Sequence, residues 1–381
     1  MYSELVKFIR KTFGVEKDFI PLHEPRFFGN ERKYVLDAID STFVSSVGAY
    51  VNKFEAMMCE ITGAKYAIAL VNGTNALHLG LILAGVEKED EVLTQALTFI
   101  ATANAISYCG ATPHFVDVDK ETMGLSPSLL KKHLEEIAIM KNGVCYNKNT
   151  NKKIAACVPM HTFGLPLYID ELIKVCNKYN IPVIEDAAES LGSYYKEKHT
   201  GTFGLIGTYS FNGNKTVTAG GGGALVTNDE NIAKRAKHLS TQAKMPHKWE
   251  YRHDEIAYNY RMPNLNAALI CAQLEQLEMY VENKRELSDL YFEFFENDDK
   301  IELVREIKDA KSNYWLNAIL LENEKERDAF LTFTNEKGIM TRPIWTLMNK
   351  LEMFKDAPKA DLSNCESLEN RVVNITSSVR I

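Results

Sequence analysis

Short β-branched segments alternate with helical segments from about residue 65 onward, and this alternation is the strongest constraint on the fold. A chain that repeats strand, helix and strand builds an open, mainly parallel sheet with helices on both faces. Such sheets bind ligands at the carboxyl ends of their strands, so we expect a functional site at that edge. The expected strands are residues 65–71, 91–94, 114–118, 154–160, 181–186, 207–211 and 223–228.

The length of the chain predicts two domains. Its 381 residues exceed the ~250 to 300 residues that one hydrophobic core usually spans. We expect a large domain with the N-terminal segment over residues 1–262, and a linking helix with a smaller α+β domain over residues 263–381. The linking element is one amphipathic helix, LNAALICAQLEQLEMYVENKREL (265–287). The polar residues 141–153 predict a surface hairpin or insertion loop.

The composition argues against several classes of function. A formal charge of −7, with 25% charged and 45% hydrophobic residues, is typical of a globular enzyme-sized protein and does not predict a nucleic-acid or anionic-membrane surface. The seven cysteines are dispersed and contain no C-x-x-C pair, which predicts reduced thiols; we expect no metal site. No apolar run reaches ~18 residues, so we expect no membrane span, and a cytoplasmic location.

A possible phosphate site follows the first expected strand, in VNGTNALHLGL (71–81). Asn72 and Gly73 form a tight turn, and the next helix begins with the amides of Thr74 and Asn75. Free amides together with the helix dipole bind phosphate well. An ordinary turn with a helix cap explains the same residues equally well.

An acid and an aromatic residue follow two further strands. IPVIEDAAES (181–190) brings Glu185 and Asp186 to the end of an apolar strand, where a buried carboxylate needs a cation or hydrogen-bond donors. A protonated ring nitrogen would be one such partner, and an Asp that caps the next helix is the structural alternative. Phe99, in LTFIATANAI (97–106), is better explained as a core aromatic when it is taken alone.

The stretch SFNGNKTVTAGGGG (210–223) places Lys215 between hydroxyl and amide groups and four consecutive glycines. A nucleoside-triphosphate loop requires G-x-x-x-x-G-K, but the interval from Gly207 to Gly213 is one residue too long and Asn214 precedes the lysine. A lysine, a phosphate cradle, a strand-end acid and an aromatic at one sheet edge are the groups that pyridoxal phosphate requires.

Several longer motifs then carry a resemblance to a known family. They are PLHEPRFFGNE, FVSSVGAYVNKFE, NGTNALHLGL, LTFIATANAI, VIEDAAESLGS, SFNGNK and YNYRMPNLNAAL, in this order from about Ile20. The chain resembles the DegT-type nucleotide-sugar aminotransferases, which use pyridoxal 5'-phosphate. The resemblance implies the fold type I of aspartate aminotransferase, an α/β fold with a mainly parallel seven-stranded sheet and a smaller C-terminal α+β domain. Two positions depart from the family pattern, the second glycine of TAGGGG and Ala257.

The resemblance also implies roles for individual residues. Lys215 would form the Schiff base with the cofactor and act as acid and base, while Asp186 would face the pyridine nitrogen. The remaining cofactor contacts would be Phe99 on the ring, Glu189 near the ring hydroxyl, and Gly73, Thr74, the amide of Asn75 and Ser210 around the phosphate. Asn259 would reach the phosphate of a neighbouring subunit, which implies a homodimer with shared active sites. We expect His161, in MHTFG, to be structural rather than catalytic.

Within the family, PLHEP, SFNGNK and TRPIW (341–345) resemble the branch that leads to bacillosamine or legionaminic acid. The implied reaction moves the amino group of L-glutamate onto C4 of a nucleotide-linked 4-keto-6-deoxy sugar such as UDP-4-keto-6-deoxy-GlcNAc, with 2-oxoglutarate as the second product and pyridoxamine phosphate as the intermediate form. UDP, GDP and dTDP remain open as the nucleotide. Candidate substrate contacts are Arg261 and Arg342, each equally well explained as a solvated surface arginine, and Asn212, Trp345 and Arg26.

Two other functions compete with transamination. One is a pyridoxal phosphate-dependent sugar dehydratase, but the dehydrating variant of the family carries histidine at the lysine position, so Lys215 favours transamination. The other is a regulator that keeps the cofactor fold without catalysis. Such a protein is expected to lack the lysine or the acid, and both are present.

Overall fold

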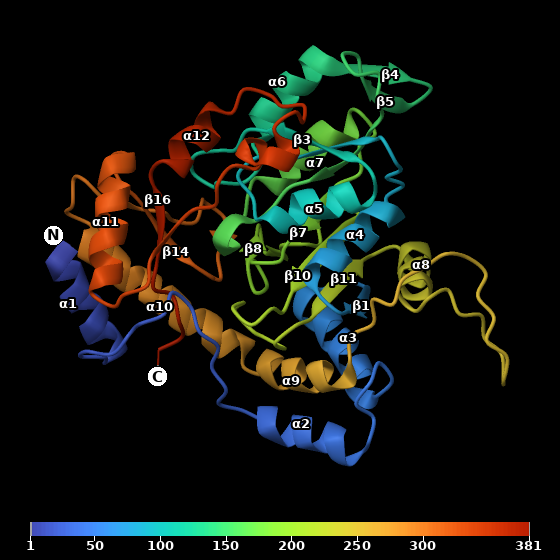
Figure 1. The fold of residues 1–381 in the computed structure, drawn as a ribbon, viewed down its shortest axis with the longest axis horizontal. Helices are drawn as coiled ribbons and strands as arrows, with labels where there is room; N and C mark the ends of the chain where they lie inside the picture. Colours follow the sequence, from blue (N-terminus) through green and yellow to red (C-terminus); the bar gives the residue numbers. More distant parts are fainter. Residues whose placement is uncertain (1, 381) are drawn as a thin grey trace.

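The computed structural model describes residues 2–380 and is built around one mixed sheet (Figure 1). Its strands lie in the order β1 (Tyr66–Leu70), β11 (Gly223–Thr227), β10 (Ile206–Ser210), β7 (Ile184–Asp186), β6 (Ile154–Val158), β2 (Glu91–Gln95) and β3 (Thr112–Val116). The first four of these strands form one hydrogen-bonded group and the last three form another. Parallel bridges from Cys157 to Val183 and from Met160 to Asp186 join the two groups between β7 and β6. Only β11 runs antiparallel to its neighbours in this sheet. All seven expected strands are thus confirmed.

Helices cover both faces of this sheet, as the alternation predicted. One face carries α4 (Gly73–Leu83), α5 (Ile100–Tyr108) and α8 (Glu230–Ser240), whose apolar side chains pack in a single cluster with the strands. The other carries α3 (Ala49–Thr62), α6 (Pro127–Ile137), α7 (Ile169–Asn177) and α9 (Asn264–Leu274). Residues next to each other in sequence determine where α6 begins. The Ser126 side chain accepts from the backbone N–H of Leu129, and Pro127 occupies the first turn.

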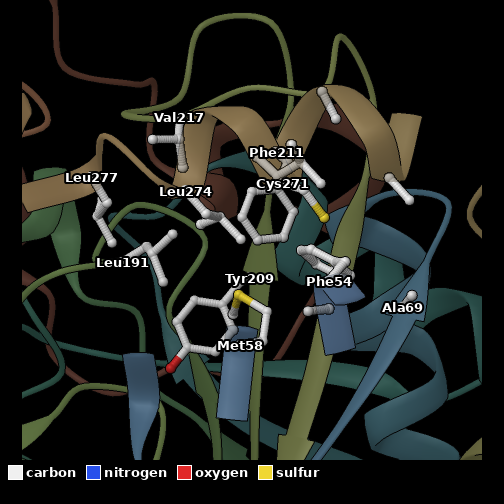
Figure 2. Packing of buried hydrophobic residues seen from close by; sticks show 14 of the residues in the cluster. Phe54, Met58, Ala69, Leu191, Tyr209, Phe211, Val217, Cys271, Leu274 and Leu277 are labelled. Atoms are coloured by element: carbon white, nitrogen blue, oxygen red, sulfur yellow. The ribbon is translucent and has the colours of Figure 1, made fainter. Parts of the chain in front are cut away.

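The helix α9 packs on one face of the large sheet, beside α3. Figure 2 shows Cys271 and Leu274 of α9 above Tyr209 of β10, with Phe211 and with Phe54 of α3 close by. The rings of Phe54 and Phe211 meet edge to face with centroids 5.3 Å apart. Because α2 (Glu31–Asp40) and α3 also pack on α9, most of this helix is buried.

The predicted single linking helix is wrong, because the structure contains two helices. α9 ends at Leu274 and α10 (Leu277–Phe295) begins three residues later. Gln276 has φ −114° and ψ 3°, and its side chain donates to Glu31 at 2.8 Å. Glu275 accepts from Lys53 at 2.8 Å and from Tyr34 at 2.7 Å. Polar contacts with α2 and α3 therefore hold the break, although the leucine pattern continues across it.

The C-terminal domain contains a second sheet in the order β12 (Glu302–Leu303), β14 (Asn317–Leu320), β16 (Val372–Ile375) and β15 (Arg342–Pro343). It packs with α10, α11 (Glu324–Glu336) and, unexpectedly, α1 (Tyr2–Phe13), which lies beside them in Figure 1. Leu5 and Ile9 of α1 are buried in this apolar cluster with Phe330 of α11. The assignment of the first residues to the large domain is therefore wrong, and the boundary at residue 262 stays a prediction.

The remaining elements are short. The polar region near residue 141 forms the expected surface hairpin, β4 (Ala138–Lys141) with β5 (Val144–Asn147). A three-stranded sheet contains β8 (Tyr194–Tyr195), β9 (Lys198–His199) and β13 (Ala310–Lys311). Single helical turns occur at η1 (Thr162–Gly164), η2 (Met348–Lys350) and η3 (Glu352–Phe354), and α12 (Ser363–Glu369) precedes β16. None of the helices in residues 2–380 has the length and apolar character of a bilayer-spanning segment.

Candidate active site

Three strand ends and one strand start meet at one edge of the large sheet. Gly223 at the start of β11 pairs with Leu70 of β1 on one side and with Ser210 of β10 on the other. In the next strand, Asp186 pairs with Thr208 of β10. A cavity of about 340 Å³ opens here. Its lining includes nine of the residues expected at the site: Gly73, Thr74, Phe99, Asp186, Glu189, Ser210, Asn212, Lys215 and Trp345.

The turn before α4 forms a polar cradle beside Ser210. Asn72 caps the helix, and its Oδ1 accepts from the backbone N–H of Asn75 at 2.8 Å, so this expected phosphate donor is engaged within the turn. A Cβ at Gly73 would lie 2.8 Å from the Cβ of Ser210, so only glycine allows this close approach. The helix N-terminus and the hydroxyls of Thr74 and Ser210 together suit a phosphate group.

Glycine is also required at the end of the four-glycine run. A Cβ at Gly223 would lie 2.3 Å from the carbonyl oxygen of Asn72. Because β11 runs directly beside the Asn72 turn, any side chain here would push the cradle away from Ser210. This contact explains one of the four glycines that the sequence pattern singled out.

Asp186 is the last residue of β7 and is buried. Its Oδ2 accepts from the Thr102 hydroxyl at 2.7 Å and its Oδ1 from Ala188 N at 3.2 Å. Burial raises the pKa of Asp186. Within residues 2–380 no basic side chain lies within ion-pair distance of it. A protonated ring nitrogen would supply the missing counter-charge.

The neighbouring acid, Glu185, has a structural role on the other side of β7. It accepts backbone N–H bonds from Gly201 at 2.7 Å and from Phe203 and Gly204 at 2.6 Å. Its remaining partner is His161, whose Nε2 lies 3.1 Å from Glu185 Oε2. His161 is not among the residues that line the cavity, in keeping with the structural role expected for it.

Lys215 follows a tight turn closed by its own N–H, which donates to Asn212 O at 3.0 Å. Its Nζ lies 3.2 Å from Glu189 Oε1. Glu189 is buried, its Oε2 accepts from Phe163 N at 2.9 Å, and burial raises its pKa to about 7. The lysine amine and the carboxylates of Asp186 and Glu189 therefore line the same cavity, which is the arrangement that the motifs required.

Phe99 lies at the cavity rather than in the core. It caps α5 with an extended backbone, and 48% of its surface is exposed. The alternative that it is a core aromatic is therefore wrong. With an amine, a strand-end acid, an aromatic ring and a helix N-terminus on one cavity, the residues present fit pyridoxal phosphate.

Two residues at this site were missed by sequence reasoning. Thr102 lies three residues after Phe99, on the first turn of α5, and that spacing was the available signal for it. Trp315 comes from the C-terminal domain and lines the cavity. Nothing in the local pattern around Trp315 distinguishes it from a core residue.

Besides Asn75, four expected residues lie outside the cavity lining. Arg261 Nε donates to Asn259 Oδ1 at 3.1 Å on the segment that follows α8. Arg342, in β15, donates to Asn335 Oδ1 at 3.1 Å. Arg26 donates to Val379 O at 3.1 Å. The structure of one chain therefore does not bring Arg26, Asn259, Arg261 and Arg342 together with Lys215.

Comparisons with known proteins agree with this chemistry. Residues 27–381 match the sequence profile of the DegT/DnrJ/EryC1/StrS aminotransferase family. The GDP-perosamine synthase of Escherichia coli O157:H7 is 40% identical over 339 residues, which cover 89% of this chain and 88% of that protein. The GDP-perosamine synthase of Vibrio cholerae is 35% identical over 361 residues, 94% of each chain.

A solved structure with a similar fold has a cofactor bound. It is the E. coli GDP-4-keto-6-deoxy-D-mannose-3-dehydratase with bound hydrated PLP. It superposes with a TM-score of 0.83 over 95% of this chain and 96% of that one, at 21% sequence identity. At this identity the likeness concerns the fold alone.

Proposed function

The chain belongs to the DegT/DnrJ/EryC1/StrS aminotransferase family of pyridoxal phosphate-dependent sugar aminotransferases, and we propose that it transfers the amino group of L-glutamate to C4 of a nucleotide-linked 4-keto-6-deoxy sugar. The observation that carries the proposal is the position of the Lys215 amine, 3.2 Å from Glu189 in the cavity that Asp186 also lines. A dehydratase has the same fold, so the fold does not decide the reaction. The lysine favours transamination.

Each of the residues at this cavity has its own role in the proposed reaction. Pyridoxal phosphate, when bound, supplies an electron sink for the bond that breaks at the amine-bearing carbon. Lys215 Nζ is the group at the cavity that can accept and return the proton of that carbon. Asp186 would keep the ring nitrogen protonated, an electrostatic contribution from a buried carboxylate. Thr74 and Ser210, together with the N-terminus of α4, would hold the phosphate.

The nucleotide is a separate question. The sequence motifs favoured a UDP-linked N-acetylhexosamine, as in bacillosamine and legionaminic acid synthesis. Similarity to two GDP-perosamine synthases supports a GDP-linked sugar at least as well. Both ketosugars therefore belong in the first assay.

We place the reaction in a homodimer with shared active sites. Asn259 lies outside the cavity of its own chain, as expected for a residue that serves the neighbouring subunit. The segment after α8 extends away from the body of the chain in Figure 1 and exposes Trp249, Tyr251 and Ile256. Exposed apolar side chains on a projecting arm are typical of a surface that is covered by a partner. The cytoplasmic location stays a prediction.

The test of the reaction is product analysis with a lysine variant. Purified protein is incubated with L-glutamate and either UDP- or GDP-linked 4-keto-6-deoxy sugar, and the amino sugar nucleotide and 2-oxoglutarate are measured by mass spectrometry. We expect Lys215→Ala to lose both turnover and the visible absorbance of the lysine-linked cofactor. Lys234→Ala, on the exposed face of α8, is the matched control and should retain both. Turnover in Lys215→Ala, or dehydration without amine transfer by the unaltered protein, would refute the proposal.

A further inference from the structure

Trp315 makes two contacts with the segment that carries the catalytic lysine. It lies between β13 and β14 in the C-terminal domain and is almost fully buried. The Nζ of Lys215 lies 3.9 Å from the centroid of its ring. Its indole Nε1 donates to Asn214 O at 2.7 Å, one residue before the lysine. One side chain therefore contacts both the amine and the backbone turn that carries it.

The backbone of Trp315 is held on both sides. Its N–H donates to Asn313 Oδ1 at 2.8 Å, and its carbonyl accepts from Lys284 Nζ at 3.1 Å. Asn313 Nδ2 in turn donates to the carbonyl oxygens of Glu189 and Leu191, both at 2.9 Å. The segment 312–315 thus connects the turn of Lys215 with the loop of Glu189.

We propose that Trp315 is a positioning residue for Lys215, holding its amine beside Glu189 through the ring face and its backbone turn through the indole N–H. The proposal rests on the catalytic role of Lys215 proposed above. An ammonium over the face of an indole is attracted by the ring quadrupole. A lysine side chain has many rotamers, so a fixed ring on one side and a carboxylate on the other restrict where Nζ can lie. A base displaced by about 1 Å can cost about a hundredfold in rate.

Two variants separate the two contacts. Trp315→Phe keeps an aromatic face and removes the N–H, whereas Trp315→Leu removes both. In single-turnover reactions with glutamate we expect Leu to lower the maximal rate about 10- to 100-fold, and Phe by about 2- to 10-fold, since it loses one hydrogen bond. The apparent dissociation constant of glutamate should stay unchanged in both variants. A residue that merely binds substrate would raise that constant and leave the maximal rate unchanged.

A second measurement does not depend on turnover. In cofactor-free protein, lysine acetylation is followed by mass spectrometry, with exposed Lys234 as the internal reference. We expect the labelling rate of Lys215 to rise about two- to fivefold in Trp315→Leu and less in Trp315→Phe, because the amine loses a cation–π contact. Trp345→Leu changes another tryptophan of the same cavity, whose ring packs against Phe99 and Phe163, and should leave that rate unaltered.

The rate and labelling measurements test the proposal even if one of the two Trp315 variants does not fold. An unchanged labelling rate of Lys215 in the folded variant, or a weaker affinity for glutamate with an unchanged maximal rate, would overturn it. The labelling result is independent of the reaction, so a failure of the proposed function is recognised separately, by Lys215→Ala retaining turnover.

Discussion

Lys284 provides the sharpest test of the electrostatics behind the site. This lysine of α10 is fully buried and donates to Trp315 O at 3.1 Å and to Ser377 O. Burial lowers its pKa from 10.5 to about 7. The unfolded chain therefore binds a proton between pH 7 and 10.5 that the folded chain lacks, so the folded state gains stability as pH rises through this interval. From these two values, the gain between pH 7.5 and 9.5 is about 2.5 kcal/mol.

The assay compares unaltered protein with Lys284→Met, a variant that keeps an unbranched side chain and lacks the amine. Urea unfolding at fixed protein concentration gives the free energy of unfolding at several pH values between 7.5 and 9.5. The stability of the unaltered protein relative to Lys284→Met should rise with pH by about 2.5 kcal/mol over the range. His23, a second buried titratable group, stays neutral over this range because burial holds its pKa well below 6.5.

The comparison has a matched control in Lys234→Met, an exposed lysine of α8, for which the difference should not vary with pH. A Lys284→Met difference that also stayed constant across the range would refute the reasoning. It would mean that Lys284 carries its charge in the folded state at these pH values.

Two predictions concern the cofactor site. Gly73→Ala places a Cβ 2.8 Å from the Cβ of Ser210, so the cradle must widen. Overpacking of this kind costs about 1 to 3 kcal/mol, so we expect the cofactor dissociation constant to rise about 5- to 100-fold in a fluorescence titration. An unchanged dissociation constant would contradict this prediction. Thr102→Val removes the hydroxyl that donates to Asp186. A hydrogen bond to a charged group contributes about 1.5 to 3 kcal/mol, so its loss should lower the maximal rate about 10- to 100-fold. Thr102→Ser keeps the donor and should retain most of the rate; equal losses in Val and Ser would exclude this hydrogen bond as the cause.

The parts of the fold that could be predicted from sequence are those that neighbours along the chain determine. Each strand of the large sheet is a short apolar or β-branched run bounded by turn residues, and burial follows directly from that composition. The same holds for the site residues that end these strands, such as Asp186 and Ser210. Parallel topology then brings their positions to one edge without further information.

The features that could not be predicted from the sequence share one physical cause: each depends on a contact with residues far away in the chain. The end of α9 depends on Lys53 and Glu31, and no local pattern reports those contacts. Trp315 lies about 100 residues from the turn that it holds. For long arginine side chains such as Arg342, the sequence gives the charge but not the direction, and Arg342 contacts Asn335 rather than the cavity.

The packing of α1 against α10 and α11 has a consequence for how the polypeptide matures. During synthesis, α1 emerges about 275 residues before the surface that buries Leu5 and Ile9. The strands and helices of the large domain can fold as they leave the ribosome, whereas the smaller unit can fold only after α10 and α11 have joined α1. Trp315 belongs to that late unit, so the turn of Lys215 acquires its final support only in the last stage of folding.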